Sequence, residues 1–109
     1  MQHVLYGSKS VFIDDEATLA LIDYAAHIAQ VGSGDRVRLD GINAEGNTIT
    51  TTFLLNPGTV LVAESTSMSS PGLDNGDAIA YMVRRTSEFS IDPGFLEPYA
   101  GDSDGAPAV

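Results

Sequence analysis

The feature that most constrains this chain is a stretch without charged residues, from Gly46 to Ala63, in a protein whose formal net charge is -10. The stretch has the residue pattern of two strands, Thr48 to Leu55 and Thr59 to Ala63, joined by Asn56-Pro57-Gly58, which we expect to form a type II turn. Neighbouring strands without charges are typical of a sheet that is covered on both faces. We therefore expect the protein's own helices on one face and a partner on the other.

The segments around this stretch predict the remaining strands. His3 to Tyr6 and Ser10 to Ile13 indicate a hairpin around Gly7-Ser8-Lys9. Asp35 to Asp40 alternates between charged and apolar residues, which predicts a half-buried strand that turns at Asn43 to Asn47 into the next one. In the strand from 48 to 55, one face carries Ile49, Thr51, Phe53 and Leu55, and the other carries Thr48, Thr50, Thr52 and Leu54.

Two helices are predicted. Asp14-Asp15-Glu16 provides a cap and first-turn negative charge for a helix that runs to about Val31 and is closed by Gly32. Apolar residues cover most of its circumference and leave a narrow polar stripe of Glu16, Asp23, His27 and Gln30. Such a helix should be covered on more than one side, by the C-terminal segment or by another copy of the chain. A second helix starts from a cap at Asp74 and reaches Arg84-Arg85, with an apolar stripe of Ile79, Met82 and Val83.

The order ββαβββα predicts a single α+β domain over residues 1–100, a mainly antiparallel sheet with helices packed on it. The segment after Phe89 combines residues that break regular structure with apolar ones, namely Pro93, Gly94, Pro98, Phe95, Leu96 and Tyr99. We expect it to form an extended C-terminal arm that packs against the body or a neighbour. We expect residues 101–109 to form a disordered acidic tail.

Composition excludes several classes of function. The chain has no cysteine, which excludes a disulfide framework, a thiolate metal site and a cysteine nucleophile. Fifteen Asp and Glu residues against five Lys and Arg residues disfavour direct binding to nucleic acid or to an anionic membrane. The N-terminal residues lack the pattern of a signal peptide, and no apolar segment approaches the roughly 20 residues that span a bilayer. These features predict a cytoplasmic protein.

Three groups of residues could carry chemistry, and each has a simpler structural interpretation. Asp14-Asp15-Glu16 could bind a hard cation, and Asp74-Asn75-Gly76-Asp77 has part of the pattern of a calcium loop, but both are typical of helix starts. His27 lies four residues after Asp23, a spacing that suits proton transfer, although a solvent-facing pair is the favoured interpretation. The sequence therefore predicts no catalytic residue, no metal site and no cofactor.

Several short motifs resemble those of a known family. The opening Val4-Leu5-Tyr6-Gly7-Ser8, followed by Phe12-Ile13-Asp14-Asp15 and Thr18-Leu19-Ala20, is similar to a small family of uncharacterised actinobacterial proteins that begin with such a strand. Leu54-Leu55-Asn56-Pro57 and the segment from Pro71 to Asn75 lie where that family has a strand-ending turn and the start of a short C-terminal helix. The resemblance covers residues 4–85 and implies a fold and a bacterial setting without a mechanism.

Members of that family are sometimes labelled ATP-dependent DNA ligases, an activity that requires a lysine nucleophile in a Lys-x-Asp-Gly motif. The nearest match here is Arg38-Leu39-Asp40-Gly41, and an arginine stays protonated and cannot form the lysyl adenylate. Lys9, the only lysine of the chain, is not followed by Asp-Gly. We therefore reject the ligase activity and interpret Asp40-Gly41 as the end of a strand.

The leading hypothesis is a non-enzymatic protein-protein interaction module that acts as a homo-oligomer or as a subunit of a larger assembly. The charge-free strands, the apolar first helix and the apolar arm together predict more apolar surface than one small chain covers. Aromatic side chains often dominate interfaces, so the arm is included in the predicted contact. The predicted interface residues are Thr50, Thr52, Leu54, Leu61, Phe95, Leu96 and Tyr99.

Three alternatives stay open from the sequence. A bacteriophage structural or accessory protein, located in the virion, would be a version of the same class. An acidic inhibitor that mimics nucleic acid would need carboxylates at regular spacing on one face, whereas here they are scattered along the chain. A small hydrolase or metal enzyme that uses Asp23 and His27 is the least favoured alternative.

Overall fold

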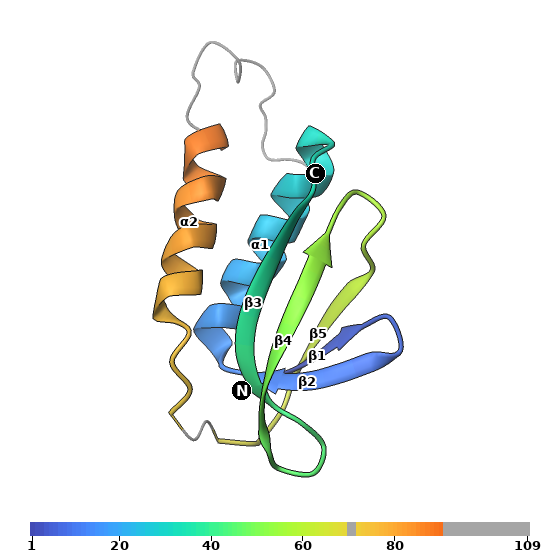
Figure 1. The fold of residues 1–109 in the computed structure, drawn as a ribbon, viewed down its shortest axis with the longest axis vertical. Helices are drawn as coiled ribbons and strands as arrows, with labels where there is room; N and C mark the ends of the chain where they lie inside the picture. The colour runs from blue at the N-terminus through green and yellow to red at the C-terminus, as the bar shows by residue number, and fades with distance from the viewer. Residues whose placement is uncertain (70–71, 91–109) are drawn as a thin grey trace.

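The computed structural model describes residues 1–69 and 72–90, and within them the chain is an α+β protein with the predicted order ββαβββα (Figure 1). Its elements are β1 (Gln2–Tyr6), β2 (Lys9–Ile13), α1 (Asp15–Val31), β3 (Asp35–Ile42), β4 (Thr48–Leu55), β5 (Leu61–Ser65) and α2 (Gly76–Ser90). The predicted arm beyond Ser90 and the predicted tail at 101–109 lie outside the described residues.

The strands form one antiparallel sheet in the order β4-β3-β2-β1-β5. β3 and β4 pair along their whole length, from Asp35 opposite Leu55 to Ile42 opposite Thr48, with no shift of register. In contrast, within the described part of the chain β2 pairs with β3 only where Phe12 lies opposite Ile42. The β3–β4 ribbon therefore leaves the rest of the sheet and runs alongside the two helices, while the β1–β2 hairpin projects away from them (Figure 1).

The core lies between the helices and the inward face of the sheet. The alternation predicted for β4 is confirmed, since Phe53 and Leu55 point inward and have no exposed surface. The helices contribute Leu21, Tyr24 and Ile28 from α1 and Met82 from α2. Burial of each large apolar side chain contributes on the order of 1.5–3 kcal/mol before the entropy of ordering the chain is counted.

Helix α1 begins and ends where the sequence predicts. The Asp14 side chain accepts a hydrogen bond from the Ala17 N–H at 3.1 Å, and Gly32 ends the helix in the left-handed conformation with φ of 68°. Helix α2 covers a second side of α1 (Figure 1), and the C-terminal segment beyond Ser90, which we expected to cover it, lies outside the described residues. The position predicted for His27 was wrong. It is 9% exposed and does not lie on a solvent-facing stripe, because α2 covers this side of the helix.

The turn between β4 and β5 differs from the expected type. The Thr59 N–H donates to the Asn56 carbonyl oxygen at 3.0 Å, and the Gly58 N–H donates to the Asn56 side chain at 2.8 Å. A type II turn requires a positive φ at Gly58, and this glycine does not have one. Because Thr59 belongs to this turn, β5 begins at Leu61, later than predicted.

Helix α2 is longer than predicted and continues past Arg84-Arg85 to Ser90. The cap lies one residue later than predicted: Asn75 directly precedes the helix, and its carbonyl oxygen accepts from the Ile79 N–H at 2.9 Å. Asp74 Oδ1 accepts from the Gly76 N–H at 3.2 Å in the turn before the helix. Met82 faces the core, but Val83, predicted on the same stripe, is 52% exposed. Neighbouring residues on a helix point about 100° apart, so only one of the two can face the core fully.

A cluster around Asp35, at the start of β3, holds α2 against the body of the protein. The Tyr24 and Tyr81 hydroxyls donate to Asp35 Oδ2 at 2.5 and 2.6 Å, and Arg85 Nε donates to the Tyr24 oxygen at 3.2 Å. Burial raises the pKa of Asp35, but the tyrosine and backbone hydrogen bonds and the Arg85 charge outweigh it and hold this pKa below its ordinary value. Burial, followed by the bond to Asp35, raises the pKa of Tyr24. An ionised carboxylate thus joins α1, β3 and α2.

Gly41 permits the close approach of β3 to β2. A Cβ at this position would lie 2.5 Å from Val11 Cγ2 and 2.8 Å from the Phe12 carbonyl oxygen. The carbonyl oxygen is part of the β2 backbone and cannot move aside as a flexible side chain can. Asp40-Gly41 therefore has a packing role near the end of a strand, which agrees with its interpretation from the sequence.

Gly41→Ala should lower the free energy of unfolding by about 1–3 kcal/mol, because the added methyl group overpacks a site bounded by backbone. Urea unfolding followed by circular dichroism measures the change. Gly34→Ala is the matched control, since its Cβ would have the Leu55 carbonyl oxygen as nearest neighbour at 3.5 Å, an ordinary contact. Equal stability of the two variants would contradict the close approach.

Asp35→Asn should destabilise the protein near neutral pH and much less in acid. Because the pKa of Asp35 is lower in the folded protein than its ordinary value of 3.8, its ionisation stabilises the fold above that value. This contribution declines as the pH falls through the folded pKa. Urea unfolding of both proteins between about pH 7 and about pH 3 should show their difference shrinking below about pH 4. A difference that is independent of pH would contradict this role.

Candidate interaction surface

Three of the predicted interface residues share the outer face of β4. Thr50 and Thr52 are exposed and Leu54 is 58% exposed, so their side chains are available to a partner. Leu61 does not belong to this surface, because it is half-buried and packs inward against the core, opposite Tyr6. The three remaining predicted residues, Phe95, Leu96 and Tyr99, lie outside the described residues.

The hydrogen bonds of the Leu54 backbone show which side of β4 is its free edge. The Tyr6 hydroxyl donates to the Leu54 carbonyl oxygen at 2.7 Å and accepts from the Leu54 N–H at 3.2 Å. Both backbone groups of Leu54 therefore point away from β3. Hydrogen-bonded and non-hydrogen-bonded pairs alternate in an antiparallel ladder, and the register here does not shift, so the same orientation holds for Thr48, Thr50 and Thr52.

Asp40, which lies opposite Thr50, supports this orientation independently. Its backbone N–H donates to Asn75 Oδ1 at 2.8 Å, and its carbonyl oxygen accepts from Asn75 Nδ2 at 3.0 Å. Asn75 Nδ2 also donates to Asp14 Oδ1 at 2.8 Å, which connects the starts of both helices. Since Asp40 directs both backbone groups to Asn75, the backbone groups of Thr50 are directed to the open side of β4.

A groove of about 350 Å³ lies between this free edge and the β1–β2 hairpin. Its lining is mainly apolar and includes Val4, Tyr6 and Val11 from the hairpin and Ile49, Thr51 and Phe53 from β4. Tyr6 meets Phe53 edge to face, with ring centroids 5.3 Å apart. Lys9, which also lines the groove, is its one charged residue in the described chain.

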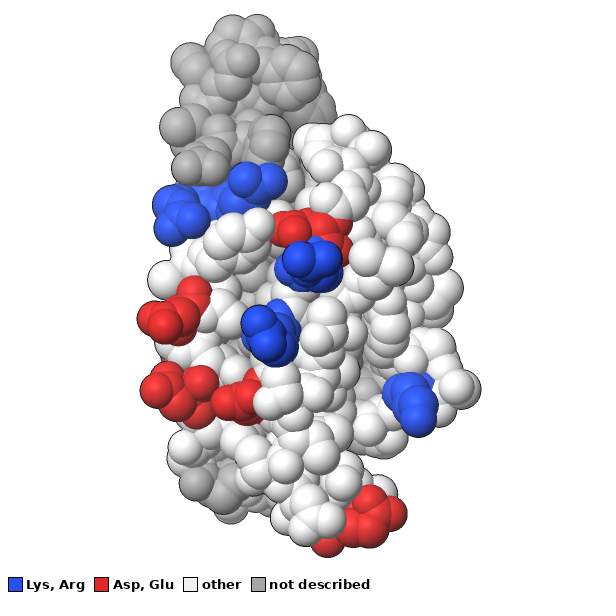
Figure 2. Space-filling view, in the orientation of Figure 1, with Lys and Arg blue, Asp and Glu red and all other residues white. Residues whose placement is uncertain are grey.

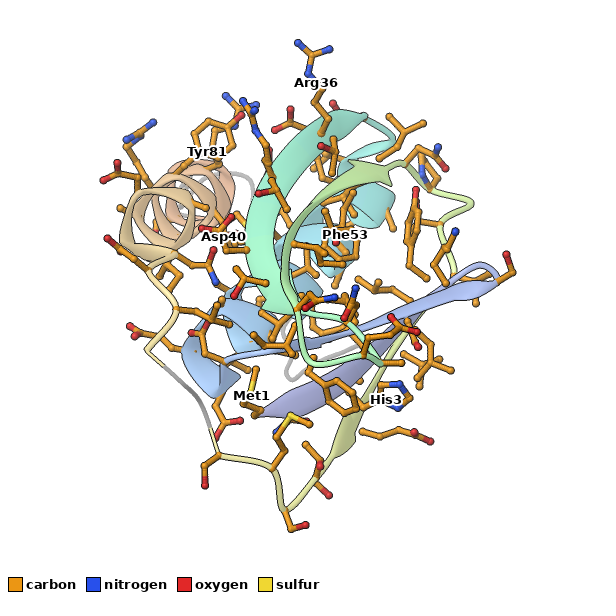
Figure 3. All side chains as sticks on the ribbon, turned by 60° about the horizontal axis from the view of Figure 1, so that its bottom comes forward. Met1, His3, Arg36, Asp40, Phe53 and Tyr81 are labelled. Carbon is orange, nitrogen blue, oxygen red and sulfur yellow. The ribbon has the colours of Figure 1, made fainter. Side chains whose placement is uncertain are left out.

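The surface around the edge carries few charges. Figure 2 shows acidic and basic side chains mainly over α2 and β3, whereas the surface over β4 and the turn that follows is largely uncharged. Exposed apolar side chains continue this surface beyond Leu54 to Val60, which is 73% exposed. In Figure 3, Arg36 projects outward from β3 while Phe53 lies beneath β4. The edge therefore separates a neutral, partly apolar exterior from an apolar groove.

The two edge strands of the sheet differ in their protection against an added strand. β5 has five residues and carries Glu64. β4 has eight residues, and it contains no charged residue, no proline and no bulge. Natural edge strands commonly use short length, charges, proline or bulges to prevent pairing with other chains. By these criteria β4 is the unprotected edge.

Asp23 and His27, the residues with catalytic spacing, differ in their exposure to solvent. Asp23 is exposed, whereas His27 is buried, and burial followed by the charge of a neighbouring arginine lowers the pKa of His27. Asp40, Asp74 and Asp77 line a polar hollow of about 340 Å³ at the start of α2. Across residues 1–69 and 72–90, however, no three histidine or acidic side chains are arranged to hold a metal ion. None of the described helices has the length and apolar character needed to cross a bilayer.

Tyr6→Phe should loosen the end of β4 without removing the ring contact to Phe53. The lost hydroxyl leaves the Leu54 N–H to water, at a cost of about 0.5–1.5 kcal/mol, while the Leu54 carbonyl oxygen keeps the hydrogen bond from Thr59 Oγ1 at 3.2 Å. Amide hydrogen exchange followed by NMR should show faster exchange at Leu54, with the inward-bonded amide of Phe53 as the internal reference. Unchanged exchange at Leu54 would contradict the proposed anchoring by Tyr6.

Neither the protein-family models, nor curated protein sequences, nor solved structures contain a match to this chain. The functional argument therefore depends on the geometry of the β4 edge and its groove.

Proposed function

We propose that this chain is a non-enzymatic protein-interaction module that receives an extended segment of a protein partner at the free edge of β4. It would act as a homo-oligomer or as a subunit of a larger assembly. The observation that carries the proposal is the unprotected edge, at which the backbone donors and acceptors of Thr48, Thr50 and Thr52 face the open side of the strand. In strand addition, such groups provide affinity through main-chain hydrogen bonds.

The groove supplies the second requirement of strand addition, a place for side chains. Side chains of a strand alternate between two faces, so every second side chain of the added segment would enter the groove beside Ile49 and Phe53. The others would lie on the outer face, next to Thr50 and Thr52. The apolar lining favours a partner with aliphatic or β-branched residues at the inward positions.

The positions of the carboxylates favour this function over mimicry of nucleic acid. Asp14 caps α1 and binds Asn75, and Asp35 accepts hydrogen bonds from two tyrosines. These carboxylates serve the fold, and they do not belong to a regular acidic array on one face. The neutral surface around β4 is the part of the chain best suited to a protein partner.

Thr50→Pro should weaken the interaction by at least about tenfold, equivalent to about 1.4 kcal/mol, because it removes the central backbone donor of the free edge. Thr50→Val is the matched control. Both variants lose the hydrogen bond from Thr50 Oγ1 to Asp40 Oδ1, which measures 3.0 Å, but only proline loses the N–H. Light scattering over a concentration series and affinity capture with each variant as bait measure the effect.

Thermal unfolding should show that both variants remain folded, since proline is tolerated on an edge strand whose N–H faces outward. The wild type and Thr50→Val should then form the same complexes, and Thr50→Pro should lose them. Complexes of equal strength in the two variants would contradict strand addition at β4.

A further inference from the structure

We propose that the segment received by the β4 edge is β4 of a second copy of this chain, antiparallel to the first, with the two-fold axis at Thr50. This inference depends on the proposed function, because it names the partner of the same edge. The two sheets would then join into one continuous sheet through identical strands. Such a contact uses the same surface on both copies and closes as a dimer.

The backbone groups that are free at the edge determine the register. Leu54 is already bound by Tyr6, so the free positions are Thr48, Thr50 and Thr52. This set is symmetric about Thr50. In an antiparallel pair, Thr50 lies opposite Thr50 of the second copy and Thr48 lies opposite its Thr52, which satisfies all three positions on both strands. If the second strand were shifted by two residues in either direction, one of Thr48, Thr50 and Thr52 would lie opposite a residue outside this set of three.

The side chains are compatible with this register on both faces. On the outer face, threonine lies opposite threonine at every hydrogen-bonded position, a favourable cross-strand pair. On the inner face, Ile49 of the second copy lies opposite Thr51 and enters the apolar groove beside Phe53. Ile49 is a β-branched residue of the kind that the groove lining favours. One strand therefore supplies both the edge and the segment that fits it.

Charge explains why a second copy would approach through this strand. Each copy carries a net charge of -10, so two copies repel each other unless the contact avoids their carboxylates. β4 has no charged residue, and the β3 residues opposite Leu54, Thr52 and Thr50 are Arg36, Arg38 and Asp40. The Asp40 carboxylate accepts a hydrogen bond from Thr50 Oγ1 of its own chain, and the two β4 strands would separate it from the Asp40 of the second copy. Pairing of the two β4 strands consequently places no carboxylate opposite another across the new ladder.

Single-cysteine variants test the register, because the natural chain has no cysteine. In Thr50→Cys the two thiols of the dimer meet at the axis, where Cα atoms of a hydrogen-bonded pair are about 5.5 Å apart, within the range for a disulfide. Thr52→Cys is the matched control on the same face. Its two copies are offset by four residues, about 14 Å along the strand, which is too far for a disulfide.

Mild oxidation with copper phenanthroline, followed by non-reducing electrophoresis and mass spectrometry, should give covalent dimers of Thr50→Cys at least about ten times faster than of Thr52→Cys. The double variant T48C/T52C keeps Thr50 and should also cross-link, because its two cysteines lie opposite each other across the axis. This double variant shows whether the cross-link reports the register or only a local effect of cysteine at position 50.

Equal rates for Thr50→Cys and Thr52→Cys, or no dimer of T48C/T52C, would overturn this inference. A wild-type chain that stays monomeric in light scattering would also overturn it. If Thr50→Pro nevertheless loses a captured partner that Thr50→Val retains, the edge accepts a different protein, and the proposed function stands while the second copy is rejected. If Thr50→Pro captures the same partners as Thr50→Val, the proposed function fails as well.

Discussion

The division of the sheet at the contact between β2 and β3 is the constraint on which the rest of the structure depends. The two strands pair where Phe12 meets Ile42, and the missing side chain of Gly41 allows that approach. At the preceding residue of β3, the side-chain amide of Asn75 forms hydrogen bonds with both backbone groups of Asp40, where a neighbouring strand would otherwise pair. The β3–β4 ribbon can therefore follow the helices, and its departure from the β1–β2 hairpin opens the groove beside β4.

The placement of charge complements this division. The chain is strongly acidic, yet Asp14 and Asp35 act inside the fold, where they cap a helix and bind two tyrosines. The ribbon instead presents a strand without charges at its outer edge. Repulsion between acidic chains is weakest where neither surface carries a carboxylate. The same strand thus combines backbone groups that point away from β3 with a sequence free of charged side chains.

Elements that depend on neighbouring residues were predictable from the sequence. The bounds of β4 and the cap of α1 at Asp14 follow from alternation and from local hydrogen bonding, and the structure confirms both. The failures concern residues whose environment is set by distant segments. His27 lies on a polar stripe by helical spacing, but α2 covers it, and Leu61, predicted at the interface, is half-buried against the core.

By itself, the sequence determined which residues of β4 share a face and that this strand is free of charge, because both properties depend only on the period of a strand and on composition. Only the tertiary structure decided that β4 is an edge strand, and in which direction its free backbone groups point. Tyr6 and Leu54 are 48 positions apart, and Asp40 and Asn75 are 35 apart. Local sequence patterns do not predict such contacts, since the contacts arise from the order of the strands in the sheet.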